Sequence, residues 1–369
     1  MAVQIARLEL SNILAVHAFA REHAIACDLS ACDTIDVVYD PAQWAQAHTA
    51  VGAMRAAMPE GDAAAEYVFY SPEEVRSRFH VHDGEYAGRE EKVCGGVGYF
   101  AGSLSAYKFG VGVLKLCLQR GLNLQTHTAA TGLARDGETG MWTAQTSRGA
   151  IAASRVVLAT NGYTAALVEE FQGVIVPMRG QITAQRPGNA VPNGGCLPTT
   201  YSFIYEKGYE YMVPRPTGSH FAGDIIMGGG LVRAPDDGLL EYGTTDDTTI
   251  NEHISTYLRE TTPRYFGSDW GADNPAGRVR NEWTGIMGYS PDGFPFVGEM
   301  PGRKGLWVSC SFQGHGMVLC WESARALVEM MDGRDGDVLS GWFPPVFRIS
   351  EDRLKKTFES RLHTSAELE

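Results

Sequence analysis

A histidine between two glycines, after an apolar segment, is the feature of this 369-residue sequence that most suggests chemistry. Residues 305–317, GLWVSCSFQGHGM, are typical of a strand followed by a glycine-rich loop that opens a helix. Free N–H groups at a helix start attract a carbonyl or an anion, and Gly314 and Gly316 let a ligand approach the backbone closely. His315 is therefore a candidate acid/base group, although a lone histidine in a turn is more often structural.

A second apolar strand also ends in small residues. In RVVLATNGYT, residues 155–164, a β-branched stretch runs directly into Thr160, Asn161 and Gly162. Buried parallel strands end in this way where a planar or anionic ligand packs on their carboxyl ends. A plain strand end has the same pattern, so the spacing alone leaves both interpretations open.

Five segments, in a fixed order along the chain, resemble the D-amino-acid-oxidase-like family of FAD-dependent oxidoreductases. The nearest subgroup contains glycine-oxidase-like and γ-glutamylputrescine-oxidase-like proteins. The resemblance implies a mixed α/β fold, in which an FAD-binding Rossmann-like domain is interleaved with an antiparallel-sheet substrate domain. The segments are RVVLATNGYT (155–164), IVPMRGQITAQRP (175–187), EYMVPRPTG with DIIMGGG (210–218 and 224–230), EWTGIMGYSPDGFPFVGEMP (282–301) and SFQGHGMVLC (311–320).

The same resemblance implies roles for individual residues. It places a first group near the flavin ring or its ribityl chain: Thr160, Gly162, Gly288, Asp292, Gly314, His315 and Gly316. It places a second group in the substrate half: Tyr205, Tyr209, Tyr211 and Arg280. Ordinary sheet packing is the alternative for each tyrosine, and a surface position is the alternative for Arg280. As catalytic residues we predict His315, Glu282, Tyr211 and Arg280, with FAD as the cofactor.

One unit of the family pattern is missing from this sequence. Family members begin with a strand, a G-x-G-x-x-G turn, a helix and an acidic residue that binds the ribose. This chain begins at the helix that follows that unit, so we expect an incomplete Rossmann-like domain and weakened FAD binding. The segment GVGYFA, residues 96–101, has a similar glycine spacing, but no buried strand precedes it and no Asp or Glu occurs between residues 92 and 135. In the family's register it corresponds to an apolar loop beside the substrate domain.

The elements that must position these residues follow from periodicity and from turn signals. Ser71-Pro72-Glu73-Glu74 predicts a capped helix start. We expect helices over residues 3–24, 42–58, 105–119, 251–260 and about 316–331. We expect strands over 34–39, 123–128, 141–146, 155–160, 180–185, 209–214, 224–228 and 305–309, those between 132 and 160 forming a meander. The expected domains are a remnant FAD-binding domain (1–34, 95–175, 280–340), a substrate domain (35–94, 176–279) and a C-terminal tail (341–369).

The composition indicates which classes of partner to expect. The net charge is −13, and no basic block occurs, so we expect neither nucleic acid nor an anionic membrane as a partner. Seven cysteines without a C-x-x-C pair favour reduced thiols and a cytoplasmic location, and no signal or membrane span is expected. His80 and His82 flank Val81 and would share one face of a strand, but no further ligand lies nearby, so we predict no metal. A second copy or a partner chain is expected to cover the sheet edge that the missing unit exposes.

Three functions remain open from the sequence. The first is FAD-dependent oxidation of an amine or amino acid, which the family resemblance implies. The second is a flavin-independent isomerase, cyclase or lyase on the same scaffold, with acid/base groups among His315, Glu282, Asp292 or a tyrosine. The third is a non-catalytic binding or scaffold protein. Each of the two enzymes would act on a small molecule.

Overall fold

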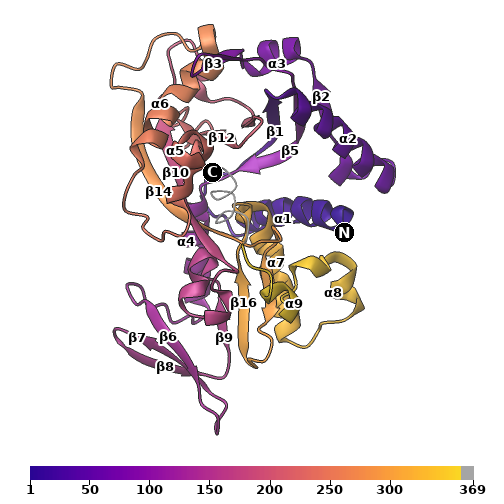
Figure 1. The fold of residues 1–369 in the computed structure, drawn as a ribbon, viewed down its shortest axis with the longest axis vertical. Coiled ribbons are helices and arrows are strands. Elements are labelled where there is room, and N and C mark those ends of the chain that lie inside the picture. Colours follow the sequence, from indigo (N-terminus) through magenta and orange to yellow (C-terminus); the bar gives the residue numbers. More distant parts are fainter. Residues whose placement is uncertain (359–369) are drawn as a thin grey trace.

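The largest sheet has eight strands in the order β14-β10-β13-β12-β11-β1-β5-β2 and forms the upper part of the molecule in Figure 1. The computed structural model describes residues 1–358. Strands β1 and β11 run parallel, and the other neighbouring pairs of this sheet are antiparallel. In sheet order the strands are Val279–Tyr289, Val176–Gln185, Ile225–Gly228, Tyr209–Pro214, Thr200–Ile204, Ser30–Val38, Gly95–Ser103 and Val68–Tyr70.

Three smaller sheets accompany it. β16 (Leu306–Cys310) lies between antiparallel β15 (Phe296–Glu299) and parallel β9 (Val156–Leu158). A separate meander extends away at the lower end in Figure 1, with strands β6 (Ala130–Arg135), β7 (Trp142–Thr146) and β8 (Gly149–Ala153). A short hairpin joins β3 (Gly84–Tyr86) to β4 (Arg89–Glu91).

Helices α1 and α7 run below the large sheet in Figure 1 and contact each other, whereas α6 packs against the large sheet beside β10. No helix within residues 1–358 combines the length and apolar character that a bilayer crossing needs. The α-helices are α1 Ala2–Glu22, α2 Pro41–Ala57, α3 Pro72–Phe79, α4 Ala106–Gln119, α5 Pro235–Gly238, α6 Glu252–Phe266, α7 Gly316–Met331, α8 Asp337–Trp342 and α9 Glu351–Leu354. The 3₁₀ turns are η1 Ala63–Ala65, η2 Asn161–Ala166, η3 Glu169–Phe171, η4 Pro192–Gly195, η5 Leu231–Arg233, η6 Leu239–Glu241, η7 Gly267–Asp269 and η8 Pro345–Phe347.

The two faces of the large sheet have different chemistry, because side chains alternate along each strand. On β12, Glu210 and Met212 belong to the face that packs on α6: Met212 is fully buried in the main core, and Glu210 accepts a hydrogen bond of 2.9 Å from the Tyr265 hydroxyl. Tyr205 and Tyr265 hydroxyls lie 2.7 Å apart in the same network. Burial raises the pKa of Glu210, and the tyrosine hydrogen bond opposes that rise.

Most of the predicted elements are confirmed. The five expected helices correspond to α1, α2, α4, α6 and α7, and the capping box of Ser71 and Glu74 is present at the start of α3. Three expectations are wrong. Residues 123–128 form no strand, and the glycine-rich segment expected as a loop is β5, whose small residues lie between β1 and β2. β9 pairs with β16 and not with the β6–β8 meander.

The predicted division into two interleaved domains stays a prediction. The large sheet combines β5 and β14, from segments assigned to the remnant FAD-binding domain, with strands of the expected substrate domain. The expected tail contributes to the core as far as it is described, since Phe343 and Phe347 are buried with Leu8 of α1. Its residues 359–369 lie outside the described part of the chain.

Helix α4 is apolar in sequence yet contains no buried residue. Leu114 and Leu118, one turn apart, are 40% and 45% exposed. A helix of this length derives most of its stability from packing. The prediction that a second copy or a partner chain covers an exposed sheet edge stays a prediction.

The turn η2 crosses strand β14 at two glycines. A Cβ on Gly288 would lie 2.8 Å from the backbone nitrogen of Gly162, and a Cβ on Gly162 would lie 2.6 Å from the carbonyl oxygen of Met287. Both contacts involve backbone atoms, which cannot move aside cheaply. The two glycines therefore allow the chain segment after β9 to rest directly on β14.

We expect Gly288→Ala to reduce the free energy of unfolding by about 2 kcal/mol, because the added methyl group forces the two backbones apart. Urea denaturation of the purified protein measures this change. Gly285→Ala on the same strand is the matched control, since a Cβ there meets no atom within 4 Å. Equal stabilities of the two variants would show that the crossing does not constrain position 288.

Candidate functional site

A cavity of about 810 Å³ lies between α1, the start of α7 and the large sheet. Ligand-binding pockets of proteins typically have this size. Residues from β5, β10, β12 and β14 line it, together with the loop that precedes α7. The lining from these elements includes Ile13, Val16 and His17 of α1, Ala101 to Ser103, Met178 to Ile182, Tyr209, Tyr211, Val213, Gly285 to Met287, Tyr289, Gly314, His315, Met317 and Val318.

Tyrosines form much of the polar surface of this cavity. The alternation of β12 directs Tyr209 and Tyr211 to the cavity, opposite to Glu210. Burial raises the pKa of Tyr211 to about 12, and burial also raises the pKa of Tyr209 and of Tyr289. Their hydroxyl groups therefore stay protonated at neutral pH and are available as uncharged hydrogen-bond donors.

The loop that presents His315 is held by Gln313. The Gln313 side chain donates to the Ser290 hydroxyl at 2.9 Å and accepts from the Ser290 backbone at 3.0 Å, while its own N–H donates to the Gly288 carbonyl at 3.0 Å. Gln313 and Ser311 both have left-handed backbone angles, with φ of 54° and 62°. The loop conformation thus depends on side-chain contacts to the end of β14, which sequence patterns did not reveal.

His315 lies at the N-terminus of α7, where it occupies the N-cap position without capping through its side chain. Its Nδ1 is 2.8 Å from the carbonyl oxygen of Gln313. A carbonyl oxygen only accepts, so Nδ1 carries the proton and Nε2 of the neutral ring is the acceptor. The ring is solvent-accessible and lines the cavity. This arrangement gives the cavity one accessible base.

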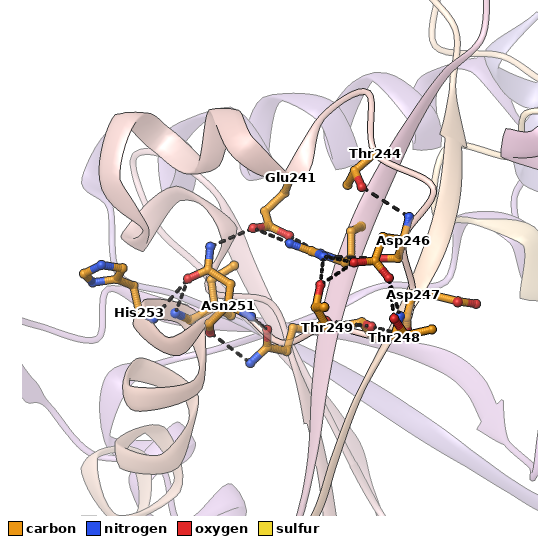
Figure 2. A network of polar contacts seen from close by, with 12 residues as sticks. Glu241, Thr244, Asp246, Asp247, Thr248, Thr249, Asn251 and His253 are labelled. Carbon is orange, nitrogen blue, oxygen red and sulfur yellow. Dashed lines mark hydrogen bonds and ion pairs between the residues drawn. The ribbon is translucent and has the colours of Figure 1, made fainter.

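Arg179 of β10 also lines the cavity, but its guanidinium is occupied. Nε and Nη2 donate to the Glu241 carboxylate at 2.6 and 3.2 Å. Nη1 donates to the Thr249 hydroxyl and to the Asp246 carbonyl oxygen at 3.1 Å. Figure 2 shows Glu241, Thr249 and Asp246 around this group, with Asn251 on the far side of Glu241. The hydrogen bond to Glu241 is the main cause that raises the pKa of Arg179.

A second histidine lines the cavity and was not predicted. His17 of α1 is 5% exposed and lies against β5, where a Cβ on Gly102 would come within 2.3 Å of its ring. Burial, and then the charge of Arg21, lower the pKa of His17 below its ordinary value. The ring is therefore neutral at physiological pH. In the sequence, the only indication of this residue was its position on the apolar face of a helix.

The structure brings together three of the predicted residues, Tyr211, Gly314 and His315, and adds Tyr209 from the wider set. Gly316 is the first residue of α7, beside them. Arg280 and Glu282, which we predicted as catalytic residues, are not part of this cavity lining, and their catalytic roles stay predictions. Arg280 pairs with Asp224 and covers the Phe221 ring, whereas Glu282 accepts from Ser255 and Arg259 at 2.6 Å each.

The remaining predicted residues lie just outside the cavity. Gly162 and Gly288 form the backbone crossing described above. The Thr160 hydroxyl lies 2.9 Å from the Thr164 hydroxyl. Tyr205 belongs to the core on the α6 side of the large sheet. None of these residues is part of the cavity lining within residues 1–358.

The two histidines considered as metal ligands have another partner. His80 Nδ1 and His82 Nε2 lie 3.1 and 3.2 Å from one oxygen of Asp269, and His80 ends α3 in a left-handed conformation. They do not lie on a strand, contrary to our expectation. Across residues 1–358, no group of three His, Cys, Asp or Glu side chains is arranged to hold a metal ion.

Asp292, which we expected near the flavin, forms a buried ion pair with Arg353 of α9. Two hydrogen bonds of 2.8 and 2.9 Å join the groups, and the Arg353 guanidinium covers the Phe296 ring. Burial alone would raise the pKa of Asp292, but the hydrogen bonds and charge of Arg353 lower it below the ordinary value of 3.8. The pair fixes the turn after β14 to the C-terminal segment.

We expect Asp292→Asn to reduce the free energy of unfolding at pH 7 by about 3 kcal/mol, because Arg353 is left buried without its partner. A carboxyl with a lowered folded-state pKa stabilises above its unfolded pKa, and this contribution is lost as pH falls through the folded-state pKa. The difference from wild type should therefore shrink at pH 3. Urea denaturation at both pH values measures it, with the exposed Asp352→Asn as control. A difference independent of pH would contradict the assignment.

Comparisons with known proteins agree with this fold. The family described as "DAO: FAD dependent oxidoreductase" matches residues 2–330. A glycine oxidase of Pseudomonas aeruginosa is 27% identical over 240 residues, which are 64% of this chain and 58% of the relative. A glycine oxidase of Pseudomonas putida is 26% identical over 231 residues, 62% of this chain and 55% of the relative.

The chain thus matches somewhat more than half the length of these curated relatives. The crystal structure of glycine oxidase from Geobacillus kaustophilus superimposes with a TM-score of 0.71 at 17% identity, covering 94% of this chain and 82% of that one. This likeness shows the fold, and the family match extends over most of the sequence. The chain belongs to the DAO family of FAD-dependent oxidoreductases.

Proposed function

We propose that this chain oxidises a carbon–nitrogen bond of an amine or amino acid with a bound flavin. The observation that carries the proposal is the cavity at the N-terminus of α7, where His315 and two tyrosines of β12 face one space in a member of this family. The names of its relatives, glycine oxidase and D-amino acid dehydrogenase, indicate the same reaction class.

The residues present fit the ring end of FAD. The cavity has room for a flat ring system, and α7 begins beside it without a side-chain cap, so backbone N–H groups near Gly316 and Met317 can receive a flavin carbonyl. Gly314 and Tyr289 would flank the ring. Bound there, oxidised flavin supplies the acceptor for the hydride that leaves the substrate carbon.

The nucleotide end of FAD has no comparable site within residues 1–358. The segment with the closest glycine spacing, residues 96–101, lies inside strand β5 and is paired with β1 on one side and β2 on the other. Helix α4 begins only at Ala106, so these glycines lie inside the sheet and do not form a turn at a helix N-terminus that could receive a diphosphate. The described residues can therefore bind the ring end of FAD and the substrate.

The protein's own part of the chemistry is proton transfer and orientation. The Nε2 of His315 accepts the proton of the substrate amine, which must be neutral before its carbon loses a hydride. The carbonyl of Gln313 holds the Nδ1 proton and so fixes the tautomer. The hydroxyls of Tyr209 and Tyr211 donate hydrogen bonds to the substrate or to the flavin.

The cofactor assignment is tested first with the purified chain. We expect protein mixed with FAD and then desalted to retain the visible absorbance band of oxidised flavin. Anaerobic addition of an amine or amino acid should bleach that band. Colourless protein that still converts a substrate would instead establish the flavin-independent enzyme, and colourless inert protein would exclude both.

Removal of the base tests the proposed role of His315. We expect His315→Gln to slow flavin reduction by about 10²-fold, because the amine then has no acceptor for its proton. The retained flavin band and the melting temperature should stay at wild-type values, since the ring makes a single local hydrogen bond. His253→Gln, an exposed histidine on α6, is the matched control. Equal reduction rates of wild type and His315→Gln would assign His315 to structure.

A further inference from the structure

The cavity offers no free fixed cation. Arg179 is its only arginine or lysine among residues 1–358, and Glu241 neutralises it through two hydrogen bonds. The Glu241 side chain is 1% exposed, so this pair is shielded from solvent. A second carboxylate, that of Asp246, lies 3.8 Å from the same guanidinium. The charge around Arg179 is therefore negative in sum, as the arrangement in Figure 2 illustrates.

The other polar groups of the cavity do not replace a cation. His17 is buried, and burial lowers its pKa, so it is neutral at physiological pH. Tyr209, Tyr211 and Tyr289 carry neutral hydroxyls. Tyr242, a further tyrosine of the lining, cannot carry a positive charge, and His315 must be neutral to accept the proton of the amine. A carboxylate in this cavity would have no side-chain cation as a partner, and the N–H groups at the start of α7 are taken by the flavin carbonyl in the proposed arrangement.

The same walls suit an amine. Tyrosine rings attract a cationic ammonium through their negative faces, and the negative sum around Arg179 adds to that attraction. Ile13, Val16, Ile182 and Met287 supply apolar surface for a hydrocarbon substituent. The register places Ile182 beside Gly228, which in turn pairs with Tyr211, so apolar and aromatic surface meet at one point of the sheet.

We propose that the substrate is an amine that carries an apolar or aromatic substituent and no carboxylate on the carbon that is oxidised. This inference rests on the proposed function and narrows the class of substrate. It separates this chain from relatives named for glycine and D-amino acids, whose substrates carry a carboxylate on that carbon.

A pair of compounds that differ only in the carboxylate tests the proposal. Calorimetry with the flavin-loaded full chain at pH 8 compares 2-phenylethylamine with D- and L-phenylalanine. We expect the amine to bind at least about 30-fold more tightly, because each amino acid brings an unpaired carboxylate into the cavity. Tighter binding of either amino acid, or binding of neither compound class, overturns the proposal.

Flavin reduction with the same compounds separates this proposal from the proposed function. If the amine binds preferentially and bleaches the flavin band, both stand. If it binds preferentially and the band persists with every compound, the oxidation proposal fails while the ligand class holds. If an amino acid binds more tightly and bleaches the band, oxidation holds and the ligand class is wrong.

An added cation provides an independent check. Ile182→Arg places a guanidinium beside Tyr211, and Asp36, the carboxylate in the same row of this face, already accepts from the Tyr99 hydroxyl, so the affinity for 3-phenylpropanoate should rise by about tenfold or more. Ile182→Gln is the uncharged control of similar length. Equal affinities of wild type, Gln and Arg variants, all with native melting behaviour, would show that carboxylates are excluded for another reason. The wild-type comparison remains decisive if Ile182→Arg does not fold.

Discussion

Strands β10 and β14 pair from Val176 with Tyr289 to Gln185 with Val279, and the candidate site depends on this long antiparallel ladder. Residues 178–182 of β10 line the cavity, as do Gly285 to Met287 and Tyr289 at the end of β14. The same end of β14 meets η2 at the glycine crossing. A shift of the ladder by one residue would reverse which side chains face the cavity. The glycine contact and the ladder therefore constrain each other.

The histidine loop inherits its position from that ladder. Gly288 accepts the backbone hydrogen bond of Gln313, and Ser290 bonds the Gln313 side chain, so the loop before α7 is attached where β14 ends. Left-handed backbone at Ser311 and Gln313 costs roughly 1 kcal/mol or more at each residue. The hydrogen bonds of the buried Gln313 side chain offset this cost. The contacts of Gln313 therefore set the position of the His315 backbone.

The sequence predicted those features that depend on residues close together in the chain. The alternation of β12, the capping box before α3 and the strand-loop-helix around His315 each depend on neighbours within a few residues. The partner of Arg280 is Asp224, which directly precedes β13, and the partners of Glu282 lie on α6. Because these residues are distant in the chain, no local pattern indicated that the two charges are paired. The glycines of β5 looked like a loop because their partners, β1 and β2, are distant in sequence.

The separation of charge between the two faces of the large sheet bears on how an amine could react here. Glu210 and its tyrosine and arginine neighbours occupy the α6 side, whereas the cavity is lined by tyrosines and hydrocarbon, with Arg179 neutralised by Glu241 as its one fixed cation within residues 1–358. Desolvation lowers the pKa of an ammonium that enters this cavity, while the tyrosine faces and the carboxylates near Arg179 act in the opposite direction. The cavity can therefore bind the ammonium and still leave its proton transferable to His315, the proposed base. An amino acid would bring the same ammonium and in addition a carboxylate, whose charge no proton transfer to His315 could remove. The walls that attract the ammonium are thus the walls that disfavour an amino acid.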